Sequence, residues 1–505
     1  MLNPPFRRFI EMRIYQNFKM LYTISIYQYP GKPRNEEGIC MSENKEVKQA
    51  KPLSQALKIF YGVGDCGFSL MTNVESYYFN FFLTNLAKFS LPIVTMITTV
   101  ASTVDACLSW MYGAILNSIK PKRWGRYRSW LMLLPWLVPF LYAFQFIKIG
   151  DGAISYIIII AAAILSHVCW NFPYVANVSM IAVAGKTPED RAQLAATRAA
   201  WGNLSKIVFS YVGPPIAAFF AAKLSEINQW GATAFVLGVI MAILYFCHFK
   251  MFEGYEEIEE VTETKKDTAR TSGGDLLKAL FQNPPLIVLI LCDLAKWMFN
   301  FVCMGAAVYY FTYVANNKGL QPQYILYSNI LCVIGSYVSK NLAKKFTTRT
   351  TTIVTYLVMA VVMLIARGMY TNIWGVIILM SIAQFGYGIC YAATPALYAD
   401  TIIYSEWKTG KNAAGWISGL QNVPLKVSIM TRGIIINACL AAGAFSADID
   451  PAAATDVLKK AICRAFIVIP AVALIIAAVL LIVGFRLTKD KVDQYSKEIA
   501  ARKAA

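Results

Sequence analysis

Four ionisable side chains lie deep inside long apolar stretches of the sequence, namely Glu75, Asp105, Arg198 and Lys426. Charges at membrane depth are costly, and those that occur usually bind ions or line the path of a solute. A carboxylate there can take up a proton or hold a cation, and an arginine or lysine can bind an anionic group. Because the four are deep and isolated in the sequence, we expect them to line a polar cavity.

Other charged side chains at similar depth have a structural explanation as well. Asp293 and Lys296 are three residues apart, on one face of a helix, and can neutralise one another. Arg432 and Lys206 can extend to a polar contact between helices. For these residues the sequence is equally compatible with a structural and a functional role.

The composition places these charges in a membrane. The chain has 505 residues, of which 57% are hydrophobic and 15% charged, whereas soluble domains carry roughly 25% charged residues. The net charge of +18 could indicate nucleic-acid binding, but Lys and Arg are enriched in the cytoplasmic loops of membrane proteins. We therefore expect a lipid bilayer and no nucleic acid as partner.

No pattern of catalytic or metal-binding residues is visible. The 11 cysteines are scattered without a CxxC pair, and two histidines are too few for a metal cluster. No nucleophile–base set and no phosphate-binding loop is present either. The sequence predicts neither an enzyme nor a bound metal or cofactor.

Apolar runs follow one another along the chain beyond residue 56. About 20 helical residues cross roughly 30 Å of hydrocarbon, so the pattern predicts an all-α membrane protein with about twelve transmembrane helices. The runs lie near residues 58–86, 90–118, 130–148, 153–184, 194–222, 231–251, 285–315, 323–344, 350–370, 373–403, 412–444 and 462–486.

The longest polar segment between runs, residues 253–274, separates six runs from six. Basic loops follow the second and the eighth run, the same place in each half. Two six-helix bundles in parallel repeat are the architecture of the major facilitator transporters. The predicted domains are an N-terminal cytoplasmic extension (1–56), a bundle (57–251), a cytoplasmic linker (252–284), a second bundle (285–487) and a cytoplasmic tail (488–505).

Loop charges predict the orientation. The loop after the second run carries Arg123, Arg126 and Arg128, whereas loops on the opposite side, such as "YVANNKGLQ", are nearly uncharged. We expect the protein to lie in the cytoplasmic membrane. The positive-inside rule then predicts that both termini are cytoplasmic.

The first forty residues contain no signal peptide pattern. Glu36-Glu37-Gly38 would be encoded by a purine-rich run that resembles a ribosome-binding site shortly before Met41. One hypothesis is that the natural protein begins at Met41, and the alternative is a genuine amphipathic extension.

A polar block in an otherwise apolar region, "DTIIYSEWKTGKN" from Asp400 to Asn412, carries a family resemblance. It resembles the block between spans ten and eleven of the glycoside–pentoside–hexuronide:cation symporters, the melibiose-permease-like branch of the major facilitator superfamily. "YGVGD" (61–65), "RWGRYRSW" (123–130), "NFPY" (171–174) and "NPPL" (283–286) resemble other motifs of that family, in the same order. The resemblance implies a cytoplasmic loop at this block.

Departures from the family pattern affect the cation site. Sodium-coupled members carry two carboxylates four residues apart in the second span, but here Asp105 is followed by Ser109. Asn171 stands where the fourth span often has Asp, and Ser69 where melibiose-type members have a carboxylate. Hard cations need several oxygen ligands, commonly charged ones, so the sequence favours H⁺ over Na⁺ as coupling ion.

The resemblance and the depth of the residues together predict three sets of site residues. The expected solute-binding set is Glu75, Asn171, Arg198, Trp201, Gln421 and Lys426. The expected cation-coupling set is Asp105, Glu75 and Ser109. The expected cytoplasmic gate is Arg123, Arg126, Arg128, Asp400, Glu406 and Lys408.

These sets lead to a functional hypothesis. Surplus buried positive charge favours an anionic solute, such as a uronide, a sulfonated sugar or an organic acid, because an unpaired buried charge is expensive. We expect a monomeric secondary transporter for a sugar-like or organic-anion solute, with Glu75 or Asp105 as the protonation site. The alternatives are a Na⁺-coupled neutral glycoside symporter, which would recognise hydroxyls through Asn73, Asn80, Asn171 and Gln421, and a transporter-like ligand sensor.

Overall fold

A computed structural model describes residues 52–118, 124–150, 152–185, 187–256, 280–410, 417 and 419–504. The hypothesis about Met41 lies outside the described residues. So do the expected gate residue Arg123 and the last two residues of the polar block, Lys411 and Asn412.

The described residues fold into helices, and no strand occurs among them. Their first half contains α2 (Gln55–Phe60), α3 (Val63–Val74), η1 (Glu75–Phe79), η2 (Phe82–Leu86), α4 (Leu91–Ser118), α5 (Arg128–Leu133), α6 (Val138–Phe144), α7 (Ala153–Ala184), α8 (Pro188–Lys223) and α9 (Gln229–Met251). The second half contains α11 (Pro284–Tyr309), η3 (Tyr310–Val314), η4 (Lys318–Leu320), α12 (Gln321–Phe346), α13 (Thr348–Gly368), α14 (Ile373–Thr409), α16 (Asn422–Ala442), η5 (Pro451–Ala453), α17 (Asp456–Cys463), η6 (Arg464–Val468), α18 (Ile469–Val483) and α19 (Lys489–Ala504).

Nine helical segments of the described chain are long and apolar enough to cross a membrane. The other three expected runs are also helical, but differ from simple spans. Residues 58–86 change between α-helix and π-helix, residues 130–148 break into α5 and α6, and α12 is continuous but carries more polar residues. Interrupted helices of this kind are tolerated where neighbouring helices satisfy the freed backbone groups.

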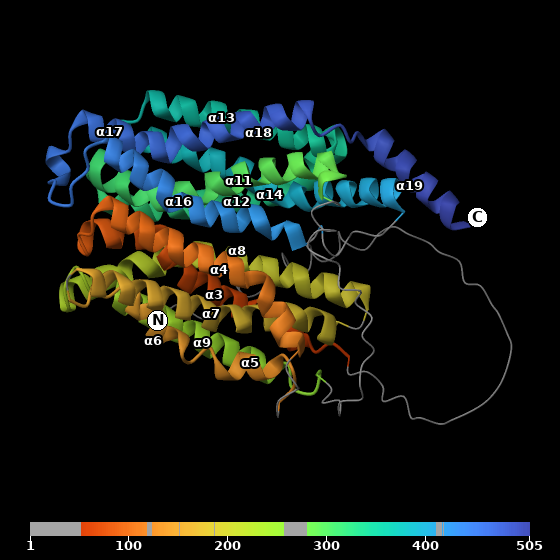
Figure 1. The fold of residues 1–505 in the computed structure, drawn as a ribbon, viewed down its shortest axis with the longest axis horizontal. Coiled ribbons are helices and arrows are strands. Elements are labelled where there is room, and N and C mark those ends of the chain that lie inside the picture. Colours follow the sequence, from red (N-terminus) through yellow and green to blue (C-terminus); the bar gives the residue numbers. More distant parts are fainter. Residues whose placement is uncertain are drawn as a thin grey trace, which may run out of the picture. The chain divides into compact units, whose positions relative to one another are not determined.

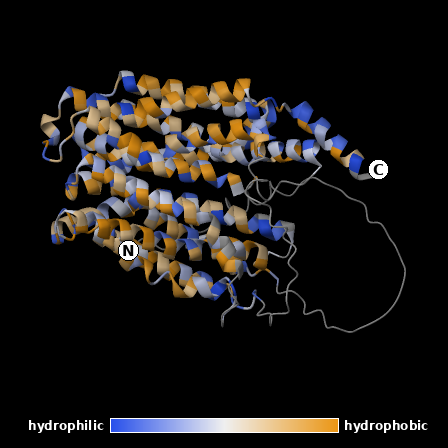
Figure 2. Cartoon of the chain, in the orientation of Figure 1, coloured by the Kyte–Doolittle hydropathy of each residue, from blue (hydrophilic) through white to orange (hydrophobic). Residues whose placement is uncertain are grey.

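Helices pack mainly within each half of the chain (Figure 1). In the first half α3 packs against α8 and α9, and α4 against α7; in the second, α14 packs against α12 and α13, and α18 against α11 and α13. Among the described residues, the halves pack against each other mainly through α4 with α16, α8 with α12, and η1 with α11. Hydrophobic residues cover most of the helix surfaces, whereas α19 is largely hydrophilic (Figure 2).

The second half begins with a capped helix. The Asn283 side chain accepts a hydrogen bond from the backbone N–H of Leu286, and prolines at 284 and 285 occupy the first turn of α11. Proline fits there because the first-turn N–H groups have no partner within a helix. The Asn283 amide also donates to the carbonyl of Thr401, 3.0 Å away, so the "NPPL" motif fixes α11 against α14.

The polar block at Asp400 is helical up to Thr409, which corrects the expected loop. α14 continues through Asp400, Glu406 and Lys408 and ends at Gly410, whose φ of 69° is left-handed. Glycine adopts this conformation without a steric penalty and commonly ends helices. The block is therefore a helical extension of span ten, at least over its described part.

Candidate solute and ion site

Asp105 lies at the centre of a buried network between the two halves. Its Oδ1 accepts a hydrogen bond from Asn171 Nδ2 at 2.9 Å, and its Oδ2 accepts from Lys426 Nζ at 2.6 Å. Asp105 and Asn171 come from α4 and α7 of the first half, whereas Lys426 comes from α16 of the second. The Asp105–Lys426 ion pair therefore joins the halves across 321 residues of sequence.

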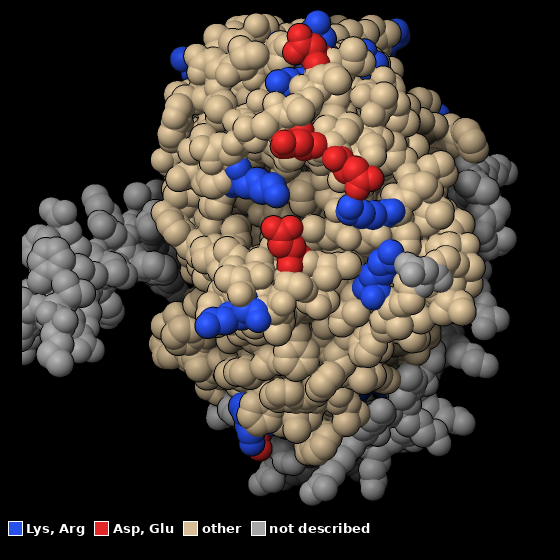
Figure 3. Space-filling view, turned by 90° about the vertical axis from the view of Figure 1, so that its left-hand side faces the viewer, with Lys and Arg blue, Asp and Glu red and all other residues tan. Residues whose placement is uncertain are grey.

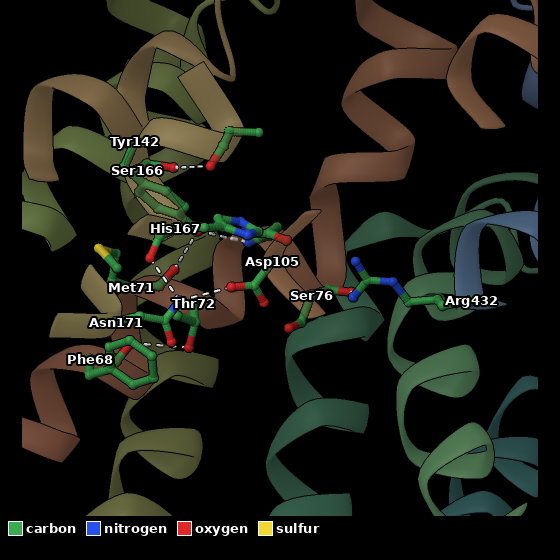
Figure 4. A network of polar contacts seen from close by, with 12 residues as sticks. Phe68, Met71, Thr72, Ser76, Asp105, Tyr142, Ser166, His167, Asn171 and Arg432 are labelled. Carbon is green, nitrogen blue, oxygen red and sulfur yellow. Dashed lines mark hydrogen bonds and ion pairs between the residues drawn. The ribbon is translucent and has the colours of Figure 1, made fainter. Parts of the chain in front are cut away.

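A second ionisable pair lies beside the first. His167 Nε2 is 3.0 Å from Glu75 Oε2, and the two side chains are 7% and 14% exposed. The His167 ring stacks on Trp170 with centroids 4.3 Å apart. Asn171 Nδ2 also donates to the backbone carbonyl of His167 at 2.7 Å, so one amide contacts both Asp105 and the backbone of His167 (Figure 4).

Glu75 is presented by an interruption of the first helix. The hydroxyl of Tyr142 accepts from the Glu75 N–H at 3.1 Å and donates to the Met71 carbonyl at 2.8 Å. An uninterrupted α-helix would bond these two backbone groups directly, so the hydroxyl is inserted into the helical ladder. The π-helix η1 begins at this point, and such π-segments are frequent at functional sites.

Arg432 of α16 reaches the same region from the second half. Its Nη1 donates to the Ser76 carbonyl at 3.2 Å, and its charge interacts with that of Glu75. Only 5% of Arg432 is exposed. Figure 4 shows its side chain extending toward the helix of Ser76. Arg432 is thus a buried cation within the network.

Arg198 belongs to a different cluster. Its Nε donates to Asp65 Oδ1 at 2.8 Å, and Asn177 Nδ2 donates to Asp65 Oδ2 at 2.7 Å. The guanidinium lies 5.0 Å from the ring centroid of Tyr174. Asp65 is ten residues before Glu75, or about 15 Å along a helix, so the structure does not place Arg198 in the Asp105 network.

The remaining expected solute and ion residues have local contacts. Trp201 Nε1 donates to the Ile59 carbonyl at 2.8 Å, beside the Arg198 cluster. Ser109 lies one turn after Asp105, but its hydroxyl donates to Ala106 within the same helix. Gln421 is half-buried at the start of α16, five residues before Lys426.

The described gate residues pack within their own halves. Arg128 Nε donates to the Phe249 carbonyl at 2.7 Å, and its guanidinium forms an ion pair with Glu253 at 3.5 Å. Lys408 Nζ donates to the Gln282 carbonyl at 2.9 Å in the second half. Asp400 and Glu406 lie on α14, and Arg126 is half-buried in the turn before α5.

Neutral polar side chains join the halves at the end that carries α17. Asn80 Nδ2 donates to Tyr309 Oη at 2.8 Å and to Asn437 Oδ1 at 2.9 Å, and the Thr84 and Tyr309 hydroxyls are 2.7 Å apart. Asn85 donates to Tyr313 nearby. We call these six residues the polar seam. Asn80, a candidate for hydroxyl recognition, is used here for contacts between helices.

One ion pair lies at the same end as the polar seam, between Lys88 Nζ and Asp448 Oδ1 at 2.6 Å. Figure 3 faces this end, and acidic and basic side chains are interspersed on it. The described residues on this face therefore form no extended region of a single charge.

The pairing of charges corrects one step of the sequence argument. Arg198 and Lys426 were expected to be surplus cations, and Glu75 and Asp105 isolated acids. Instead, Arg198 pairs with Asp65, Lys426 with Asp105, and Glu75 with His167. The partners are far apart in sequence, so isolation along the chain did not imply isolation in space.

Sequence reasoning missed His167 and Tyr142 as site residues. His167 precedes Asn171 by four residues, which places both on one helix face. That spacing could have indicated that His167 lies beside Asn171 in the site. Tyr142 lies in an apolar run, and no pattern in the sequence links it to Glu75.

Helices long and apolar enough to span a membrane, with a buried ion pair between two sets of them, are typical of a multi-pass membrane transporter. Residues 60–489 match the family model described as MFS/sugar transport protein, and the chain belongs to this family. Its all-α fold and the resemblance to the glycoside–pentoside–hexuronide symporters are thereby confirmed.

Known relatives are transporters of sugar-like solutes. The chain is 24% identical to the isoprimeverose transporter of Lactiplantibacillus pentosus, over 77% of this chain and 80% of that protein. It is 26% identical to the putative sulfoquinovose importer of Salmonella typhimurium, over 89% of this chain and 94% of that protein. A bacterial homologue of the human lysosomal transporter Spinster, solved in an inward-facing and unoccupied conformation, has the same fold. It has a TM-score of 0.60 and 13% identity, covering 86% of this chain and 98% of that one.

Proposed function

We propose that this protein is a proton-coupled secondary transporter that carries a sugar-like anion across the cytoplasmic membrane by alternating access. The observation that carries the proposal is the network of Asp105, Lys426, Glu75, His167 and Arg432 between the halves. A network of buried titratable groups between two moving halves can bind a proton and a charged solute together.

The contacts of Asp105 support H⁺ over Na⁺. Both of its carboxylate oxygens already accept hydrogen bonds, one from an ammonium and one from an amide. A sodium ion needs several oxygen ligands and would have to displace the Lys426 ammonium. The neighbouring position that could supply a second carboxylate holds Ser109, whose hydroxyl is turned to its own helix.

The names of the relatives support a sugar-like solute and leave its charge to experiment. Sulfoquinovose carries a sulfonate, which favours the anion proposal, whereas isoprimeverose is a neutral disaccharide, which favours the Na⁺-coupled neutral glycoside alternative. Glu75 and Asp105 balance the charges of Arg432 and Lys426, so the positive charge on which the anion proposal depends comes from a proton added to this network.

We further propose that both termini are cytoplasmic and that the chain acts as a monomer. The basic loop at Arg126 and Arg128 then lies inside the cell, and the polar seam lies at the outer end. The seam bonds hold the halves together there, which supports an inward-facing state.

Uptake into proteoliposomes tests this function. We expect sulfoquinovose or glucuronate to accumulate when a pH gradient is imposed, with no requirement for sodium. Accumulation of isoprimeverose driven by sodium would instead establish the neutral alternative. Binding of a solute without counterflow exchange of label would identify a sensor.

A further inference from the structure

The position of the coupling proton can be inferred from how the buried network balances its charge. Glu75 faces His167 from α7, Tyr142 from α6 and Arg432 from α16, and its charge also interacts with that of Asp105 from α4. Lys426 from α16 completes the set through Asp105. Tyr142 is neutral and hydrogen-bonded to backbone, so five side chains determine the charge.

Asp105 is poorly suited to carry an exchangeable proton. Lys426 Nζ donates to one of its oxygens at 2.6 Å and Asn171 to the other at 2.9 Å. Protonating Asp105 would break the ion pair and leave the ammonium of Lys426 without a counter-ion in a partly buried position, which is unfavourable. The Lys426 ammonium thus already neutralises the Asp105 carboxylate, which disfavours binding of a proton there.

Among the described residues, no lysine or arginine donates a hydrogen bond to the side chains of Glu75 and His167, unlike Lys426 at Asp105. Imidazole is the side chain that ordinarily gains or loses a proton between pH 5 and 8. With neutral His167, the two carboxylates of Glu75 and Asp105 balance Lys426 and Arg432. A proton added to the pair leaves one net positive charge in a buried site, and a singly charged anion removes it.

One nitrogen of His167 is available for that anion. Nδ1 is buried and has no hydrogen-bond partner among the described residues. In the protonated ring both nitrogens donate, so protonation creates an N–H at Nδ1 that needs an acceptor. The oxygen of a sulfonate or carboxylate is an acceptor of the required charge.

We propose that the His167–Glu75 pair carries one coupling proton per singly charged anionic solute, and that protonated His167 donates to the solute through Nδ1. This inference rests on the proposed function. Because proton and anion bind and leave together, transport is electroneutral. By reciprocity, the proton strengthens binding of the anion as much as the anion strengthens binding of the proton.

Binding and uptake measurements on variants test the proposal. In the unmodified protein, affinity for sulfoquinovose or glucuronate should rise as pH falls from 8 to 5.5, by at most about tenfold per pH unit for one linked proton. His167→Gln can still hydrogen-bond to Glu75 but takes up no proton. It should show at every pH the weak binding that the unmodified protein shows at pH 8, and no accumulation driven by a pH gradient.

His248→Gln is the matched control, because His248 is also buried but lies on α9 beside Tyr61 and Phe252. It should keep the pH dependence. Glu75→Gln, measured in parallel, should also lose gradient-driven accumulation, and thermal unfolding of each variant identifies any that fails to fold.

Three results would overturn parts of the proposal separately. Accumulation by folded His167→Gln under a pH gradient would place the proton elsewhere. Uptake that responds to an imposed membrane potential in the absence of a pH gradient would exclude the one-to-one stoichiometry. No uptake of either anion by the unmodified protein would overturn the proposed function itself, whatever the variants do.

Discussion

Asp105 and Lys426 show how a buried ion pair can connect the two halves of a transporter. Each partner is needed mainly because the other is present, since a lone charge at this depth is unfavourable. Replacing one partner alone should therefore cost more free energy of unfolding than the intact pair contributes.

A double-mutant cycle tests this interdependence. Lys426→Gln alone leaves Asp105 ionised without its counter-ion, and we expect it to lower the free energy of unfolding by up to about 3 kcal/mol, a bound reduced by the partial exposure of Lys426. Asp105→Asn combined with Lys426→Gln should recover most of that loss. Thermal unfolding in detergent measures both, and additive losses would show that the two side chains do not interact.

The first helix owes its shape to one hydroxyl group. Tyr142 bridges the N–H of Glu75 and the carbonyl of Met71, at the junction of α3 and η1. Without the hydroxyl, the Glu75 N–H would keep only the Thr72 carbonyl as partner, or it would bond to the Met71 carbonyl and turn Glu75 away from His167.

Tyr142→Phe should therefore impair transport more than stability. We expect a loss of about 1–3 kcal/mol at most from the unmatched backbone groups, together with a severe loss of gradient-driven uptake. Tyr245→Phe is the control, because the Tyr245 hydroxyl is buried without a hydrogen-bond partner among the described residues. Equal uptake by both variants would mean that the hydroxyl does not position Glu75.

The C-terminal helix α19 docks on the end of α14. Trp407 stacks on Tyr495 with centroids 4.2 Å apart, and its Nε1 donates to Glu498 Oε2 at 2.5 Å. The hydrogen bond from Trp407, and then the one from Gln494, lowers the pKa of Glu498. A carboxyl whose pKa is lowered in the folded state stabilises the docked state above its ordinary pKa, and this contribution is lost as pH falls through the lowered value.

We therefore expect α19 to stay docked between pH 7 and 5 and to loosen as pH falls below about 4. Glu498→Ala should loosen it at neutral pH. The distance between spin labels placed on α14 and α19 reports both effects. A distance in the unmodified protein that stays constant from pH 7 to 3 would show that Glu498 does not hold the helix.

Helix positions were predictable because long apolar runs have few alternatives in a membrane. Their interruptions were not, since the π-helix at Glu75 depends on a hydroxyl 67 residues away. The extension of α14 was missed because charged residues suggested a loop, although Gly410 marked the true end. Residue types at the centre were predicted, but pairings such as Asp105 with Lys426 depend on how the two halves meet.

At the scale of the molecule, the polar seam holds the two halves together at one end. Replacing Lys88 and Asp448 by cysteine, in a background without the exposed Cys107 and Cys247, allows the halves to be cross-linked there. We expect a short bifunctional maleimide to abolish uptake while solute still binds to protein in detergent. Each single cysteine is the control, and undiminished uptake after complete cross-linking would show that this end need not open.

The seam also bears on how reversible the transporter is. Its members are amides and hydroxyls, and each neutral hydrogen bond contributes only about 0.5–1.5 kcal/mol net, because water replaces it when the halves separate. Solute binding can shift an equilibrium of this size between the joined and the separated halves. Added salt should hardly affect the hydrogen bonds of the seam, because their members are uncharged. The fold therefore does not favour one direction of transport: the same molecule should import or export its solute according to the combined gradients of proton and solute.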